Sequence, residues 1–259
     1  MRNGSLKLLL VCGLSLLPAG APALAQPADK DAQEASVPAS DTKLSLAKAP
    51  DIAARYGLPD WMDEKWLVIV HRGDLTIDRH LLLDWTRDSA LKDQQAVLWL
   101  ELFAPGLKDE PRAAKAQGLV VDGNLTVNGS ILNTNEDGGP TLVVTGKTTA
   151  RSLLAGGAFI NFRGPAQFSE AIHSQYNHGE LYFEGPVKAP LLINSDHALS
   201  LMHSSGKSGI RTYFSNEEHE DWNGVDVPAT VKPVVRPEFT TIDAIRDAIR
   251  QAKPVLKQQ

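Results

Sequence analysis

Cysteine is nearly missing from this chain of 259 residues: its single copy, Cys12, lies in an N-terminal segment that reads as an export signal. A chain that loses this segment has no thiol, which excludes disulfides and thiolate chemistry. Basic charge is scarce as well. The whole chain carries a net charge of −5, and removal of Arg2 and Lys7 with the signal leaves −7. This balance, with no basic stripe along the chain, argues against nucleic acid as a partner.

Long apolar runs and common catalytic motifs are also absent. No segment approaches the roughly 18 consecutive apolar residues of a membrane-spanning helix, so no membrane span is expected. The chain contains no G-x-S-x-G, H-E-x-x-H or P-loop motif. We therefore predict no catalytic residues, no cofactor and no confident metal site.

The N-terminus has the organisation of a secretory signal over residues 1–25. Arg2 and Lys7 form a basic region, an apolar run from Leu8 to Leu17 follows, and Ala23-Leu24-Ala25 resembles a cleavage site. Acylation at Cys12 is the alternative, disfavoured because Val11 precedes it. Residues 26–50 are rich in Ala, Pro, Ser, Asp and Lys without apolar periodicity, which predicts a disordered linker. We expect a periplasmic or secreted protein.

The main positive feature is a repeat of about 20 residues. Its four copies carry a glycine preceded by an apolar residue at −2 and followed by small or apolar residues at +4 and +8, with no gap needed between −2 and +8. The glycines are Gly123, Gly146, Gly164 and Gly185, and the −2 residues are Val121, Val144, Phe162 and Phe183. The +4 residues are Val127, Ala150, Phe168 and Ala189, and the +8 residues are Ile131, Leu154, Ile172 and Ile193. We expect all of these apolar residues in one core.

Short alternating segments between the glycines indicate strands rather than helices, as in Leu125-Thr126-Val127. A period of this length built from strands predicts a mainly β protein, a parallel β-helix (solenoid) whose repeat spans residues 118–215. The recurring glycine suits either a positive φ or a close backbone approach. A weaker copy at Gly73, with Asp74-Leu75-Thr76-Ile77 after it, is either a further coil or a hairpin outside the stack.

Two flanks surround the repeat. The N-terminal flank, 51–117, holds four of the five tryptophans, Trp61, Trp66, Trp85 and Trp99. We favour a plug of large side chains over the open end of the solenoid, with a sugar-stacking platform as the alternative. The C-terminal flank, 216–259, is a loop followed by an amphipathic helix capped by Thr241, whose stripe runs from Ile242 to Ala252. That helix should dock on the flank of the solenoid or at its far end.

Five of the seven histidines lie between residues 173 and 219, two of them in turn-like phrases. Those phrases make up the candidate binding residues: Tyr176, Asn177, His178, Asn194, Asp196 and His197. On adjacent coils about 4.8 Å apart, two imidazoles and Asp196 could share a metal. Because Asn, His, Asp and Gly also make tight turns, we favour structural turns and keep a metal site and catalysis as alternatives. The acidic run from Glu217 to Asp221 is interpreted as a solvated loop.

The repeat phrases Gly-Asn-Leu-Thr-Val at 123–127 and Val-Val-Thr-Gly at 143–146 resemble those of the bacterial polymer-forming cytoskeletal, bactofilin-like proteins. The two histidine turns resemble an uncharacterised, exported subset with longer flanks. This resemblance covers residues 118–197. It implies a right-handed β-helix of short coils, no cofactor, and a scaffold or self-association role rather than catalysis.

From these features we expect an exported, non-catalytic β-helix scaffold or interaction protein of the bacterial cell envelope, with a protein partner or a second copy as its ligand. Capped ends would stop it from stacking into filaments. The alternative is a periplasmic carbohydrate-binding or polysaccharide-cleaving β-helix protein that uses the region of His178, Asp196 and His197.

Overall fold

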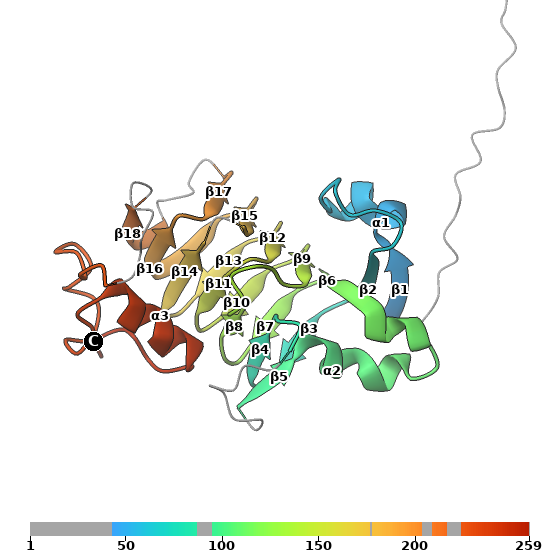
Figure 1. The fold of residues 1–259 in the computed structure, drawn as a ribbon, viewed down its shortest axis with the longest axis horizontal. Coiled ribbons are helices and arrows are strands. Elements are labelled where there is room, and N and C mark those ends of the chain that lie inside the picture. The colour runs from blue at the N-terminus through green and yellow to red at the C-terminus, as the bar shows by residue number, and fades with distance from the viewer. Residues whose placement is uncertain (1–42, 87–94, 177, 204–208, 217–223, 259) are drawn as a thin grey trace, which may run out of the picture. The chain divides into compact units, whose positions relative to one another are not determined.

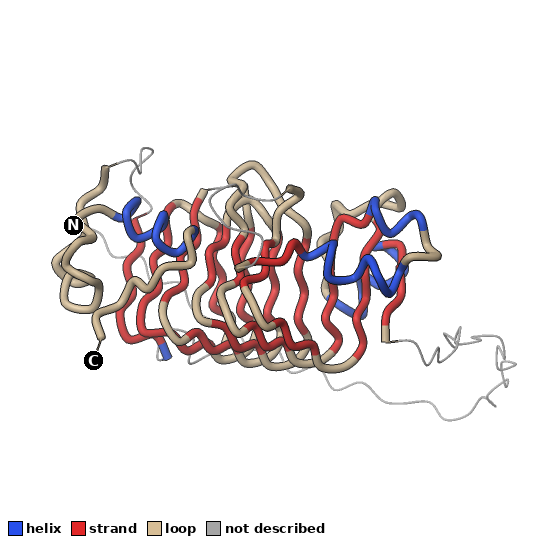
Figure 2. The backbone as a smooth tube through the Cα atoms, turned by 90° about the horizontal axis from the view of Figure 1, so that it is seen from below, coloured by secondary structure: helices blue, strands red, loops and turns tan. Residues whose placement is uncertain are grey.

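The computed structural model describes residues 43–86, 95–176, 178–203, 209–216 and 224–258. The signal segment, Asn177 and the acidic run at 217–221 lie outside these residues. The predicted fold class is confirmed: parallel strands stack as a β-solenoid, with one helix near the C-terminus. Figure 2 shows the strands of successive coils aligned side by side along the stack. No helix among the described residues is long and apolar enough to cross a membrane.

Each coil contributes one strand to each of three sheets, which we call A, B and C. Sheet A contains β1 (Leu44–Lys48), β2 (Leu67–Arg72), β6 (Ala116–Asp122), β9 (Thr141–Val144), β12 (Phe159–Phe162), β15 (Glu180–Phe183) and β17 (Ala198–Leu201). Sheet B contains β3 (Leu75–Ile77), β7 (Leu125–Val127), β10 (Thr148–Ala150), β13 (Ala166–Phe168) and the first part of β16 (Val187–Ser195). Sheet C contains β5 (Ala96–Leu98), β4 (His80–Leu82), β8 (Ile131–Leu132), β11 (Leu153–Ala155), β14 (Ala171–Gln175), the rest of β16, and β18 (Ile210–Asn216). All these neighbours pair in parallel except β1, which is antiparallel to β2.

The weaker copy at Gly73 belongs to the stack. β2 pairs in parallel with β6 and β3 with β7, so residues 67–82 form a coil rather than a separate hairpin. The following coil starts only at β6. The residues between β4 and β6 add β5 to the edge of sheet C and contain α2 (Trp99–Phe103), η1 (Ala104–Leu107) and η2 (Pro111–Lys115).

The glycine column is explained by close backbone approach. A Cβ on Gly146 would lie 2.5 Å from the carbonyl oxygen of Gly123, and one on Gly185 would lie 2.5 Å from the carbonyl carbon of Gly164. Only Gly73, at the start of the column, has a positive φ, of 88°. Each later glycine is therefore needed because a backbone group of the preceding coil occupies the space of its side chain.

The predicted core is correct at −2 and +4 and wrong in part at +8. The residues at −2 and +4 pair in register across the coils and lie in the central core. At +8, however, Ile131 pairs with Leu153 and Ile172 with Leu192, one residue before the predicted partners. The turn from sheet B to sheet C is one residue shorter in two coils. Leu154 and Ile193 therefore face outward, into a second apolar cluster.

That second cluster lies between sheet C and the C-terminal flank. Helix α3 (Ile242–Arg250) begins as predicted, because Thr241 Oγ1 accepts a hydrogen bond from the Ala244 amide at 3.2 Å. It buries Ile242, Ile245 and Ile249 against the outer face of sheet C, so it docks on the flank of the solenoid and not at its end. The last residue of the predicted stripe, Ala252, is not part of the helix: α3 ends at Arg250, and Ala252 has a φ of 57°. Figure 1 shows α3 beside β14 and β16.

The N-terminal flank covers a different face. The linker predicted over residues 26–50 is wrong for its last part, because Leu44–Lys48 forms β1 and α1 (Ala49–Tyr56) follows at once. Alternating Leu44 and Leu46 pack against the central core, which the linker composition conceals. The segment from Ala49 to Met62 packs on the outer face of sheet A, on Val68, Val70, Val120 and Val143.

Candidate functional site

The predicted histidine turns divide into a buried part and an exposed part. His197, between β16 and β17, is 6% exposed. Its Nδ1 donates to the carbonyl oxygens of Gln175 and Tyr176 on the preceding coil, at 3.0 and 2.8 Å. Burial lowers the pKa of His197, so its ring is neutral, and its two hydrogen bonds join adjacent coils.

Two further predicted residues serve the same corner. Asn194 is buried, accepts a hydrogen bond from Ser174 Oγ at 2.7 Å and donates to the carbonyl of His197 at 3.2 Å. Asp196 occupies a turn position with φ 50°. Among the described residues, no group of three His, Cys, Asp or Glu side chains is placed to hold a metal ion. The geometry of these residues is that of a structural turn.

His178 and Tyr176 face outward instead. The side chain of His178 is 55% exposed, and its Nδ1 lies 3.8 Å from a carboxylate oxygen of Asp137. The Tyr176 ring meets the imidazole edge-on, with centroids 4.6 Å apart. Tyr176 thus connects the two histidines, through its carbonyl to His197 and through its ring to His178.

His178 leads into a groove on the outer face of sheet A. One cavity of about 270 Å³ is lined by Trp61, Trp66, Trp85, Asp137, Gly138, Gly139, Gly157, Phe159, His178 and Glu180. A second, of about 370 Å³, is lined by Gly57, Pro59, Asp60, Trp61, Phe159, Asn161, Glu180, Tyr182, Glu184 and Met202. The two share Trp61, Phe159 and Glu180, and we call them together the aromatic groove.

Aromatic rings form the walls of the groove. Trp61 stands edge-on to Trp66 with centroids 5.1 Å apart, and Phe159 lies 5.5 Å from Tyr182. Trp61 is 48% exposed and Trp85 42% exposed. The prediction that the tryptophans plug the end of the solenoid therefore holds only for Trp99, which lies in the central core and is 1% exposed. Trp61 and Trp85 present ring surface to solvent.

Hydrogen-bonded polar groups form the floor. Tyr182 donates its hydroxyl to Glu180 at 2.7 Å, and this bond raises the pKa of Tyr182. Glu184 accepts from Asn161 Nδ2 at 2.8 Å and from Arg163 Nε at 3.3 Å. Glu184 thereby uses both oxygens to hold its neighbours, and it acts as a support of the floor.

The wall that carries Trp61 is tied to sheet A at its base. Tyr56, the last residue of α1, donates to Asp122 at 2.9 Å, and Arg55 pairs with the same carboxylate at 2.8 Å. Arg163 Nη1 donates to the carbonyl of Arg55 at 2.8 Å. Helix α1 is thus fixed to two coils, and the groove is open between that anchor and the last strands of sheet A.

A buried carboxylate fixes the position of Trp85. The preceding residue, Asp84, is 3% exposed and accepts hydrogen bonds from Asn133 Nδ2, at 2.9 Å, and from Thr134 Oγ1, at 2.8 Å. Burial raises the pKa of Asp84, while the hydrogen bonds act in the opposite direction. These contacts hold the corner from which the Trp85 ring projects, packed edge-on against Trp99 at 6.4 Å.

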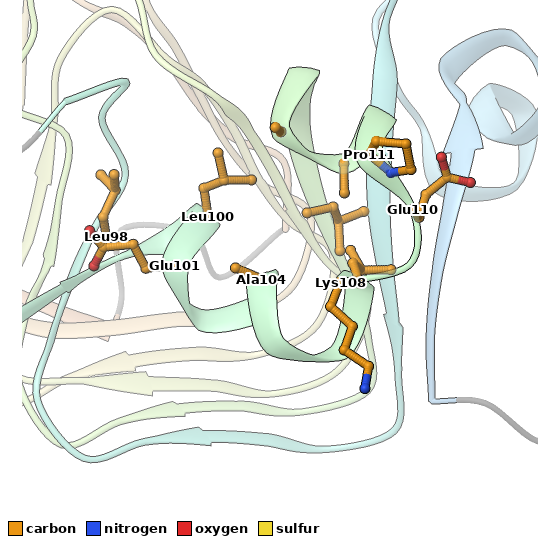
Figure 3. Close-up of a pocket in the computed structure, with 11 residues that line it drawn as sticks. Leu98, Leu100, Glu101, Ala104, Lys108, Glu110 and Pro111 are labelled. Carbon is orange, nitrogen blue, oxygen red and sulfur yellow. The ribbon is translucent and has the colours of Figure 1, made fainter.

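A separate cavity of about 340 Å³ lies in the N-terminal cap, between α2, η1 and η2. Figure 3 shows Leu98, Leu100 and Ala104 around it, with charged Glu101, Lys108 and Glu110 among the labelled lining residues. Most of its lining is aliphatic, so it would select a ligand by shape more than by hydrogen bonding. The aromatic groove offers both kinds of contact and is the stronger candidate site.

Sequence reasoning identified His178 and the tryptophans but did not join them into one site. Phe159 and Asn161 were missed, and the available signal was polar and aromatic residues at outward positions of sheet A strands. No model of a known protein family matches the chain, and no curated protein or solved structure matches it either. The bactofilin-like resemblance therefore stays a prediction.

Proposed function

We propose that the protein is an exported, non-catalytic β-helix binding protein of the cell envelope, and that its ligand is a glycan held in the aromatic groove. The observation that carries this proposal is the pairing of exposed rings with carboxylate and amide groups in two joined cavities. Sugar rings have apolar C–H faces that pack on aromatic rings and hydroxyls that donate to carboxylates. Ligand sites in general combine an apolar lining with a few placed polar groups.

The groove also has a suitable length. Two joined cavities that share Trp61 at their centre would hold neighbouring sugar units, one on each side of that ring. The predicted export signal supports a location outside the cytoplasm, where envelope polysaccharides are found. Fractionation of cells that produce the full chain checks export, and recovery of the protein with the cytoplasm would contradict it.

Calorimetry and a glycan array test the binding itself. We expect Trp61→Ala to weaken the best glycan about tenfold, because loss of one stacked ring removes about 1.4 kcal/mol. The control is Gln167→Ala, since Gln167 is exposed on the outer face of sheet B and lines neither cavity. A protein that binds no glycan, or that loses binding equally with Gln167→Ala, would refute the groove as the site.

Self-association is a second candidate function, favoured by one difference between the ends. The N-terminal end is closed by antiparallel β1, by β5 and by the buried rings of α2. At the other end, Leu199 and Leu201 are half-buried, and no described strand pairs with the outer edge of β17. Two copies that pair through this end would form a dimer and not a filament, because the N-terminal end of each copy is closed. Sedimentation should show a dimer that Leu201→Asp dissociates, and a monomer at high concentration would rule this out.

A further inference from the structure

The charged side chains that line the aromatic groove are predominantly acidic. Its described lining includes the carboxylates of Asp60, Asp137, Glu180 and Glu184, and no lysine or arginine. Arg163, which contacts the groove residue Glu184, is engaged with that carboxylate and with the carbonyl of Arg55. An acidic glycan would meet repulsion along the whole groove, whereas a cationic ligand would be attracted.

One buried polar group at the floor lacks a partner. Asn161 is 5% exposed and lines the second cavity, where its Nδ2 is held by Glu184. Its Oδ1 is buried with no hydrogen-bond partner among the residues that the structure describes. A buried acceptor without a donor is unfavourable. Because an amide oxygen can only accept, the missing partner is a hydrogen-bond donor.

The rings next to this floor favour the same kind of ligand. Phe159 and Asn161 alternate along β12, and their register partners on the adjacent strand β15 are Glu180 and Tyr182. Trp61 lines the same cavity from the N-terminal segment. The face of an aromatic ring carries negative partial charge and attracts a nearby ammonium group. Aromatic rings, carboxylates and an amide with an unpaired oxygen therefore line one cavity.

We propose that the groove selects glycans that carry free, protonated amino groups, and that an amino-sugar unit sits at Asn161 and Glu180. This inference rests on the glycan-binding function proposed above and specifies its ligand class. The ammonium group donates to Asn161 Oδ1 and to Glu180, and the sugar ring packs on Trp61. An N-acetylated unit has lost the charge, and a uronic acid has the opposite charge.

The test compares three oligosaccharides of equal length by calorimetry, at a mildly acidic pH that keeps the amine protonated. These are glucosamine, N-acetylglucosamine and galacturonic acid oligomers. We expect the glucosamine oligomer to bind at least about tenfold more tightly than the N-acetylated one, with an affinity that falls as salt is added. The galacturonic acid oligomer should not bind.

Two variants of nearly equal shape locate the selectivity. Glu180→Gln should lower the affinity for the glucosamine oligomer about tenfold and leave that for the N-acetylated oligomer unchanged. The control Glu238→Gln removes a carboxylate that pairs with Arg236 in the C-terminal flank, outside the groove, and should change neither. Circular dichroism and thermal melting check that both variants fold.

Each other outcome is informative. Equal affinity for glucosamine and N-acetylglucosamine oligomers would overturn the amino-group selectivity and leave glycan binding intact. A linear polyamine that binds as tightly as the glucosamine oligomer would also overturn it, because charge alone would then suffice. Binding of none of the oligosaccharides here or on the array would overturn the proposed function as well.

Discussion

The outer faces of sheets A and C begin alike and end differently. Both present apolar side chains outward from successive coils, Val68, Val120 and Val143 on sheet A and Leu82, Leu132 and Leu154 on sheet C. On sheet C, the C-terminal flank continues across the later coils and buries Ile193 as well. On sheet A, the cluster beneath the N-terminal segment ends at Phe159 and Tyr182, and these two residues line the groove together with Asn161.

The difference shows that the extent of the covering segment decides what an outer face becomes. A fully covered face is a second core, with close-packed aliphatic side chains and a buried, neutral histidine. On a partly covered face, a groove forms where the covering segment ends, and on sheet A this is the aromatic groove. The two faces should therefore respond in opposite ways to substitution, in stability on one side and in binding on the other.

The largest effect is expected from Ile245→Ala on the covered face. Ile245 is fully buried between α3 and sheet C, so its truncation should lower the free energy of unfolding by about 2–5 kcal/mol. Urea denaturation measures this, and glycan affinity should be unchanged. An unfolding free energy equal to that of the parent protein would show that the C-terminal flank does not contribute to the folded core.

A second effect, which is small near neutral pH and grows as acid is added, is expected through His173 on the same face. His173 is 1% exposed and burial lowers its pKa to about 3, so it stays neutral in the folded state below its ordinary pKa of 6.5. The unfolded chain binds this proton more readily, and stability should fall as pH drops below 6.5 towards 3. The slope from this group is about 1.4 kcal/mol per pH unit.

Two basic side chains also lower the pKa of His173. They are Arg246, which pairs with Asp243 and Asp247 on α3, and, as the smaller contribution, His197. His80, whose pKa is lowered to about 4 by burial, adds a loss of the same sign. Denaturation of His173→Gln across this pH range should show a shallower slope than the parent protein. An identical slope would mean that His173 is already hydrated in the folded state.

The smallest effect on stability is expected from Trp61→Ala on the partly covered face. Trp61 is 48% exposed and packs edge-on against Trp66, so its removal should lower the free energy of unfolding by about 1 kcal/mol, less than the loss of a fully buried side chain. The same variant is the one expected to weaken glycan binding. A loss of stability comparable to that of Ile245→Ala would make Trp61 a packing residue and erase the contrast between the two faces.

The fold was predictable because every coil needs an apolar or a small residue at the same positions. Val121, Val144, Phe162 and Phe183 fill one column of the core, and the glycines two residues later meet the backbone of the previous coil. The register of sheet C was not predictable in the same way. Leu153-Leu154 and Leu191-Leu192-Ile193 are apolar throughout because both faces of that sheet are buried, so alternation does not show which side faces the core.

The candidate site was harder to predict because its walls are distant in the sequence. Trp61 and Trp85 come from the N-terminal region, while Phe159 and Glu180 lie on coils about a hundred residues later. Nothing in the spacing of the tryptophans indicates which of them remain exposed. Trp99 enters the core because β5 adds to sheet C just before it, a pairing that only the three-dimensional structure reveals.

The glycine column also limits where the molecule can grow. Between sheets A and B, successive backbones touch at every coil, and the connections from β2 to β3 and from β15 to β16 span only residues 73–74 and 184–186. Backbones of neighbouring coils also meet at the corner between sheets C and A, at Gly157 and Gly179, but the length of this corner varies widely. The connection from β4 to β6 spans residues 83–115 and that from β16 to β17 only 196–197. New loops can be inserted at this second corner without breaking the stack, and it is there that Trp85, Asp137 and His178 line the groove. If the groove binds glycans as proposed, insertions at this corner can change its ligand preference while the solenoid itself stays unchanged.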